Sequence, residues 1–443
     1  MTSPSLPMNA TISNSDDAHF PDLYKIATTL FPLKRCLMGD AVNISLDYLE
    51  SLNPYFRRLS FPSGYQAFDW IVPNEWNLKR ATLIHESGLV VADSDRNFLE
   101  AVLYSQSLDI HIDKKDLISK LHYSDARPSA IPYHTSYYKK DWGFCLSKQA
   151  SQILPDGTYH AQIKATFEPG HLSLSHAVIP GNTTKEILFT SYICHPNMAN
   201  NEVSGPTVIM ALANYISNLD DRHYTYRFVL APETIGALCY LSLHLSDLRI
   251  NTISGFVLSC LGDDRAYSHI SSPTGANASD IALEAALIGK QNVTRYSFCE
   301  RGSDERQYCS PNVDLPVCGF CRSKYGTYSE YHTSDDDLSL ISEKGLQNSF
   351  DVLRSIVDCY EFGVIPKLTT TGEPCLGSRG LYQTLDNVGS RSLQTQNIEN
   401  IIAFADGVKT FFEICRITNM PLENCLQAAK QLERHQVIKV GYI

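Results

Sequence analysis

The spacing of hydrophobic positions changes at regular intervals from about Thr158 onward. Short runs rich in apolar, β-branched and aromatic residues have the length and composition of buried strands, and they lie at 159–167, 172–179, 186–193, 224–231 and 253–261. Apolar residues recur at helical spacing over 207–219, 236–245, 279–289 and 338–362. This alternation predicts an α/β domain in which a mixed sheet carries helices on both faces.

The segments before this alternation have a different pattern. Two amphipathic helices are predicted at 22–31 and 44–59. Residues 64–145 contain short alternating runs and all three tryptophans, which predicts a small β-rich unit inserted into a main domain formed by 21–63 and 146–365. We expect the aromatic side chains of this insertion to fill its own interior. Residues 1–20 have the composition of a disordered lead-in.

The end of the chain has a third pattern. Residues 366–380 are rich in turn formers and are predicted to be a linker. Helical patterns at 397–404, 408–418 and 422–435, followed by a strand at 437–442, predict a winged-helix-like module over 372–443. This module contains seven basic and seven acidic residues, so we expect it to pack or dimerise rather than bind nucleic acid.

Composition narrows the class of protein. The chain has 443 residues, of which 43% are hydrophobic, and its formal net charge is -11, which argues against a broad nucleic-acid surface. No apolar run approaches the roughly 20 residues that span a bilayer, so we expect no membrane partner. The 13 cysteines have no paired zinc-knuckle spacing and no basic-then-apolar leader precedes them, which predicts reduced thiols and a cytoplasmic protein.

A histidine stands where one predicted strand ends and a helix begins. His195 follows the strand 186–193, and Gly205-Pro206 opens the next helix after a short polar loop. Ligands and metals bind at the carboxyl ends of strands in open α/β sheets, so His195 is a candidate site residue. A histidine in such a loop can equally be an ordinary hydrogen-bonded residue, so the interpretation needs partners elsewhere in the chain.

Three further loops supply candidate partners. Glu233 follows the strand 224–231, and Asp304 and Glu305 lie in 301–308 beside Arg301 and Arg306. Tyr331-His332-Thr333 precedes the long helix at 338–362. Each stretch alone is also explained by helix capping or a solvated turn. Together they place His, Glu, Asp and His at successive loops.

The chain resembles the bacterial aminopeptidase-like domain family after about Tyr24. This family combines a zinc-peptidase fold, related to co-catalytic aminopeptidases and glutaminyl cyclases, with a small inserted β domain and a C-terminal winged helix. The matching segments are 68–70 (FDW), 73–76 (PNEW), 131–133 (IPY), 142–145 (WGFC), 194–196 (CHP), 199–200 (AN), 204–206 (SGP), 232–236 (PETIG), 302–309 (GSDERQYC) and 331–333 (YHT).

The resemblance implies roles for individual residues. His195, Asp304 and His332 would be zinc ligands, and Glu233 would be the general base that takes a proton from water. A second set would face the substrate, with Arg306 and Arg301 positioned for a carboxylate. This second set is Arg306, Arg301, Tyr331, Asn201 and Glu202.

One position departs from the family. Asn201 stands where the peptidases have the aspartate that bridges two zinc ions. An asparagine is neutral and offers one oxygen acceptor, so we expect one zinc ion rather than two. The adjacent Glu202 could substitute for the missing carboxylate, although neighbouring loop residues usually point in different directions.

These observations leave two functional hypotheses. The first is a zinc-dependent, aminopeptidase-like hydrolase that acts on the peptide or amide bond of a small amino-acyl conjugate or short peptide. The second is a catalytically altered protein that binds a ligand or partner, or carries out acyl transfer or cyclisation. The sequence leaves the oligomeric state open, including a homo-oligomer.

Overall fold

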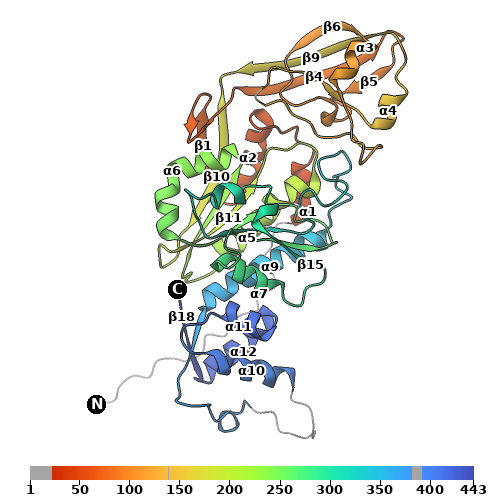
Figure 1. Cartoon of the computed structure of the whole chain (residues 1–443). Helices are drawn as coiled ribbons and strands as arrows, with labels where there is room; N and C mark the ends of the chain where they lie inside the picture. Colours follow the sequence, from red (N-terminus) through yellow and green to blue (C-terminus); the bar gives the residue numbers. More distant parts are fainter. Residues whose placement is uncertain (1–21, 138, 382–391) are drawn as a thin grey trace.

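The computed structural model describes residues 22–137, 139–381 and 392–443. Its centre is an eight-stranded sheet in the order β1-β10-β12-β11-β13-β16-β14-β15, which confirms the predicted α/β class (Figure 1). The strands are β1 (Arg57–Pro62), β10 (His171–Ile179), β11 (Glu186–Tyr192), β12 (Thr225–Ala231), β13 (Thr252–Leu258), β14 (Tyr267–Ile270), β15 (Val293–Tyr296) and β16 (Val317–Cys321).

The four central strands are parallel, and both faces of the sheet are buried. β12 pairs in parallel with β11, β11 with β13, and β13 with β16. Alternate side chains enter two different cores, with Phe189 on one face and Leu188 on the other. The first face is covered by α1 (Leu23–Leu30), α2 (Asp40–Leu52), α5 (Ser204–Ser217), α7 (Ala278–Leu287) and α9 (Glu343–Phe362), and the second by α6 (Ile235–Asn251).

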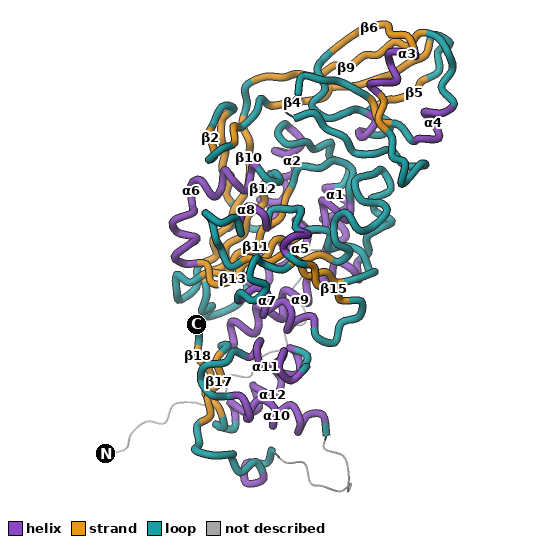
Figure 2. Tube along the Cα trace, viewed as in Figure 1, coloured by secondary structure: helices purple, strands orange, loops and turns teal. Residues whose placement is uncertain are grey.

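The inserted β unit lies at one end of the molecule and is longer than predicted (Figure 2). Its sheet has the order β5-β4-β9-β6. The prediction that it ends at residue 145 is wrong, because β9 pairs with β4 and β6 rather than with the main sheet. An alternating strand pattern does not reveal which sheet the strand joins. The unit comprises β4 (Glu75–His85), β5 (Val90–Asp93), β6 (Leu108–Asp113), α3 (Lys114–Leu117), β7 (Leu121–His122), β8 (Phe144–Cys145), α4 (Lys148–Gln152) and β9 (Thr158–Glu168).

The C-terminal unit starts earlier than predicted. The segment expected to be a linker forms β17 (Ile365–Leu368), which pairs antiparallel with β18 (Ile438–Gly441). The α-helices described between these strands are α10 (Leu393–Phe404), α11 (Phe411–Thr418) and α12 (Leu422–Arg434). Phe411 and Cys415 of α11 are buried in the hydrophobic core that α7 and α9 also share, so the unit packs directly on the main domain.

The amino-terminal residues and the possibility of a membrane-spanning helix were also considered in the sequence. The lead-in predicted for residues 1–20 lies outside the described residues. None of the described helices combines the length and the apolar character needed to cross a membrane.

Candidate functional site

Two neighbouring strands bring His195 and Glu233 together. β11 and β12 are parallel, so the residues that follow them meet at one edge of the sheet. His195 Nε2 lies 3.8 Å from Glu233 Oε2. The Glu233 backbone N–H also donates to Cys194 Sγ at 3.4 Å, which ties the two strand ends together. The sequence pattern alone placed both residues at strand ends.

Glu202 orients the His195 ring by bonding to Nδ1, the ring nitrogen that does not face Glu233. Its Oε2 accepts a hydrogen bond from His195 Nδ1 at 2.8 Å, so Nε2 is left to face Glu233. Glu202 lies in a π-helical turn, Ala199–Val203, and its side chain is fully buried. Burial opposes a charged imidazolium, but Cys194 and Glu202 outweigh it and raise the pKa of His195 well above its usual range. Glu202 therefore fixes the orientation and charge of the His195 ring, and it does not line the cavity itself.

Arg35 supports this arrangement, although sequence reasoning did not single it out. Its Nε donates to the His195 carbonyl oxygen at 3.2 Å and lies 3.8 Å from Glu202 Oε1. Arg35 is fully buried, so it balances the Glu202 charge inside the protein. Nothing about an arginine in a predicted loop indicates a contact with a residue 160 positions away.

His332 approaches from the loop before α9. Its ring centroid lies 5.2 Å from that of His195, and its ring stacks on Tyr331 at 3.9 Å. The loop is held by the part of the β insertion that connects β7 and β8, since the Tyr133 N–H donates to the His332 carbonyl oxygen at 2.9 Å. His332 Nε2 is buried without a hydrogen-bond partner among the described residues. Burial and the neighbouring His195 lower the pKa of His332 to about 3, so the ring is neutral.

Asp304 is buried and contacts the residue that follows Glu233 in the chain. Its Oδ1 accepts a hydrogen bond from the Thr234 N–H at 2.7 Å. Thr234 has φ +66°, an unusual conformation for a β-branched residue, and its Oγ1 accepts a hydrogen bond from Arg306 at 2.6 Å. Burial and the nearby Glu233 raise the pKa of Asp304 well above its usual range, and burial also raises the pKa of Glu233. Two buried carboxyl groups side by side favour a cation nearby.

These residues surround a cavity of about 290 Å³. Four of the residues proposed from the sequence line it, namely His195, Glu233, Arg306 and His332. The other lining residues are Leu37, Trp70, Tyr133, Thr135, Tyr137, Cys194, Thr234 and Ile235. The lining does not include Asp304, Arg301, Tyr331, Asn201 or Glu202.

Two of these residues, Asn201 and Arg301, make contacts elsewhere in the structure. The Asn201 Oδ1 accepts a hydrogen bond from the Tyr192 hydroxyl at 2.8 Å, and its Nδ2 donates to Met198 Sδ at 3.4 Å. Arg301 lies over the Phe298 ring at 4.6 Å and donates to the Phe298 carbonyl oxygen. A substrate-binding role for these side chains stays a prediction from the sequence.

The donor atoms around the cavity fit one zinc ion. His195 and His332 offer imidazole nitrogens, which are common zinc ligands, and the unpartnered Nε2 of His332 is a buried atom that a metal would satisfy. Asp304 stays the predicted carboxylate ligand, while Glu233 is free to act as a base. At the position where the peptidases have a bridging aspartate, the Asn201 amide is neutral and its oxygen accepts a hydrogen bond from Tyr192.

Close donor sets occur at two places in the described part of the chain. Cys194, His195 and Glu202 form one, and His269, Asp280 and Cys318 form the other, with donor atoms within 4.8 Å of one another in each. His195, Asp304 and His332 do not form such a set. In the first set His195 makes its contacts through Nδ1, so its Nε2 stays available at the cavity.

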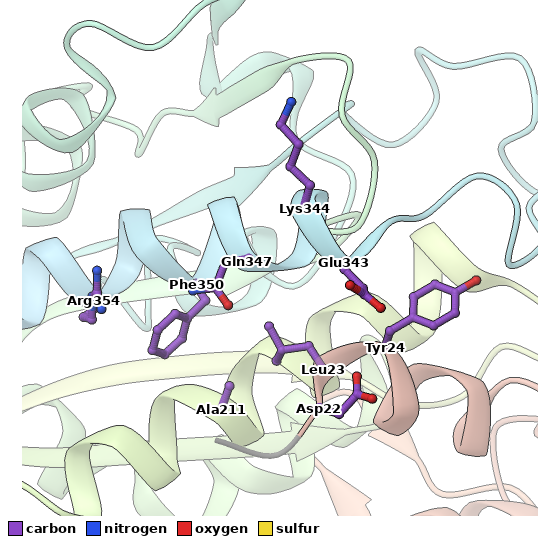
Figure 3. A pocket seen from close by; sticks show the side chains of 9 residues that line it. All are labelled: Asp22, Leu23, Tyr24, Ala211, Glu343, Lys344, Gln347, Phe350 and Arg354. Carbon is purple, nitrogen blue, oxygen red and sulfur yellow. The ribbon is translucent and has the colours of Figure 1, made fainter. Parts of the chain in front are cut away.

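A larger cavity of about 640 Å³ lies elsewhere, between α1, α5 and α9 (Figure 3). Its walls carry Asp22, Glu343, Lys344 and Arg354 but contain no histidine or cysteine. This cavity is the larger of the two, but the smaller cavity has the histidine side chains that can bind a metal ion, so we take the smaller one as the candidate site.

Comparisons with known proteins agree with this arrangement. Residues 24–362 match a family model described as "Domain of unknown function (DUF4910)", and residues 364–440 match one described as "winged helix-turn-helix". The chain is 32% identical over 436 residues to a Clostridium acetobutylicum protein, covering 98% of this chain and 99% of that protein. That relative is provisionally named a polysaccharide biosynthesis protein with aminopeptidase-like domain.

Solved structures show the same fold. A crystal structure from Clostridium acetobutylicum, provisionally called a peptidase, has a TM-score of 0.85 at 31% identity and covers 94% of this chain and 96% of that chain. The zinc aminopeptidase BSAP from Bacillus subtilis has a TM-score of 0.56 at 14% identity and covers 77% of this chain and 94% of that chain. The second match shows a shared fold only. The chain thus belongs to the aminopeptidase-like domain family, with a winged helix-turn-helix unit at its C-terminal end.

Proposed function

We propose that this protein is a zinc-dependent hydrolase with one metal ion, which cleaves the amide bond of a small conjugate. The observation that carries the proposal is the meeting of His195 Nε2, His332 and Glu233 at a single cavity. The aminopeptidase-like fold, which the zinc aminopeptidase BSAP shares, supports the choice of metal. The name of the Clostridium relative favours a biosynthetic rather than a degradative role.

The residues around the cavity have different roles in the proposed reaction. When bound, zinc polarises the substrate carbonyl and lowers the pKa of water. His195 is held by Glu202 so that Nε2 faces the cavity, and His332 contributes a neutral imidazole. Glu233 takes the proton from the attacking water and passes it to the departing nitrogen. Its raised pKa suits this role, because a base with a higher pKa holds the proton more firmly.

Two further features belong to the proposal. All 13 cysteines are free thiols, which fits a reducing compartment such as the cytoplasm. We propose a small molecule or short peptide as the partner, with no role for nucleic acid or membranes.

The test is hydrolysis by protein loaded with one equivalent of zinc, scored by amine release from a panel of small amides. We expect turnover that stops on chelation and returns with zinc. Glu233→Gln should retain zinc and lose turnover. A zinc-loaded protein that releases no amine from any of the amides would contradict the proposal.

A second candidate function rests on Asn201, which replaces a charged ligand by a neutral amide bonded to Tyr192. In this alternative the protein binds the conjugate, or transfers its acyl group, without hydrolysis. The same panel separates the two functions, because binding without amine release favours the alternative.

A further inference from the structure

We infer that the cavity selects amides that carry a carboxylate beside the scissile bond, such as N-acyl amino acids, and rejects free terminal amines. The inference rests on the proposed function and names the substrate class for the same site. It depends on Arg306 and on the aromatic wall contributed by the β insertion.

Arg306 has unused hydrogen-bonding capacity at the cavity. It lies in α8 (Glu305–Tyr308), lines the cavity and donates to Thr234 Oγ1. Among the described residues it forms no ion pair. It lines the same cavity as Glu233 and His195. A guanidinium has five N–H donors arranged to grip a carboxylate, and this one lies beside the reacting centre.

A substrate with a free terminal amine would place its positive charge near the positively charged guanidinium of Arg306. An aminopeptidase substrate presents an ammonium group next to the reacting carbonyl, and that group needs an anionic partner. Among the described residues Glu233 is the one carboxylate that lines the cavity, and it faces His195 at 3.8 Å. Asp304 is buried, does not line the cavity, and accepts a hydrogen bond from the Thr234 N–H. The guanidinium of Arg306 therefore repels an ammonium and attracts a carboxylate.

The rest of the lining suits an apolar or flat acyl group. Trp70 lies in the hairpin of β2 (Gln66–Ala67) and β3 (Trp70–Ile71) and is 37% exposed, contrary to the expectation that the tryptophans fill the interior of the insertion. Tyr133 and Tyr137 lie on the same cavity, with their hydroxyls 2.7 Å apart. Aromatic faces hold flat groups by stacking and by excluding water.

The proposed reaction conserves atoms and charge. Water adds its oxygen to the acyl carbon, the C–N bond breaks, and a carboxylic acid and an amino acid are released. The proton removed from water by Glu233 goes to the departing amine. No oxidant or reductant is needed. Arg306 holds the amino acid carboxylate while the aromatic wall holds the acyl group.

The experiment uses N-benzoylglycine, N-benzoylglycinamide and glycine p-nitroanilide as probes. Titration calorimetry with zinc-loaded Glu233→Gln measures binding without turnover. We expect N-benzoylglycine to bind at least tenfold more tightly than the other two. Adding Arg306→Gln should remove this preference, whereas Arg80→Gln, the loss of an exposed arginine of β4 that does not line the cavity, should change binding less than twofold.

Turnover separates this inference from the proposed function. If the wild-type enzyme hydrolyses glycine p-nitroanilide better than N-benzoylglycine, or if Arg306→Gln leaves the carboxylate preference intact, the inference is overturned while the hydrolase proposal stands. If no amide is hydrolysed by zinc-loaded protein, the proposed function fails. In that case, the binding of N-benzoylglycine to Glu233→Gln, measured with and without Arg306→Gln, would still show whether Arg306 binds the carboxylate.

Discussion

Two clusters of the same side-chain types lie in different regions of the sheet. In one, His195 bonds Glu202 at 2.8 Å and has Glu233 at 3.8 Å from its other nitrogen. In the other, His269 bonds Asp280 at 2.8 Å and has Glu284 at 3.9 Å from its other nitrogen. Each cluster also contains a buried cysteine. Composition and pair distances therefore do not distinguish them.

The difference lies in the second carboxylate. Glu284 is neutralised by Arg295 and by Arg416 of α11, each at 2.7 Å, and thereby joins α7 to the winged-helix unit. Glu233 has a histidine as its ionic partner in the described part of the chain, and it lines a cavity. A buried histidine paired with carboxylates stabilises a fold by default. It becomes a candidate site when the second carboxylate forms no ion pair with an arginine among the described residues and lines a cavity.

The largest effect should separate these two carboxylates. We expect Glu233→Gln to lower the rate of amide hydrolysis about 10²- to 10⁴-fold, because the base for proton transfer is lost. Glu284→Gln should leave the rate within twofold and lower the free energy of unfolding by about 1 kcal/mol through weakened ion pairs. Initial rates and chemical denaturation measure the two effects. Equal rate losses in both variants would remove the distinction between the clusters.

A smaller effect should separate the two carboxylates that bond a histidine directly. Glu202→Gln should weaken zinc binding about 10- to 100-fold, because the ring of His195 loses the carboxylate that orients it. Asp280→Asn should leave zinc affinity unchanged and cost about 3 kcal/mol of stability, because a buried pair is broken. Competition with a chelator measures the affinity. Unchanged affinity in Glu202→Gln would contradict the role given to that residue.

The stability effect of Asp280 should also depend on pH. Burial opposes ionisation, but hydrogen bonds from His269 and Ser272 outweigh it and lower the pKa of Asp280. A carboxyl with a lowered folded-state pKa stabilises the protein above its unfolded pKa of about 3.9, and this contribution is lost as the pH falls. The difference in unfolding free energy between wild type and Asp280→Asn should therefore shrink below about pH 4. A constant difference would contradict this cause.

The smallest effect should come from Asn201→Asp. The new carboxylate would keep the hydrogen bond from Tyr192 but add a buried charge without a cation, so we expect a loss of about 1 kcal/mol or more of stability. Zinc content should stay at one ion per chain. A second tightly bound ion would mean that the site needs only the missing aspartate to become binuclear.

Much of the fold could be predicted from local sequence patterns, whereas the residues that support the site from distant parts of the chain could not. Hydrophobic spacing placed His195 and Glu233 at the ends of strands that prove to be neighbours. It assigned β9 to the wrong unit, because a strand pattern carries no information about its pairing partner. Arg35 and Trp70 contribute to the site through contacts that depend on the folded chain, with Arg35 reaching a residue 160 positions away. Such contacts leave no local signal.

The central claim is that His195 and His332 bind one zinc ion at the cavity. The most direct test is zinc per chain after loading and dialysis, measured by elemental analysis for wild type, His332→Ala and His269→Ala. We expect one zinc ion per chain for wild type and His269→Ala and close to none for His332→Ala. Wild-type protein without zinc, or His332→Ala with the same zinc content as wild type, would contradict it.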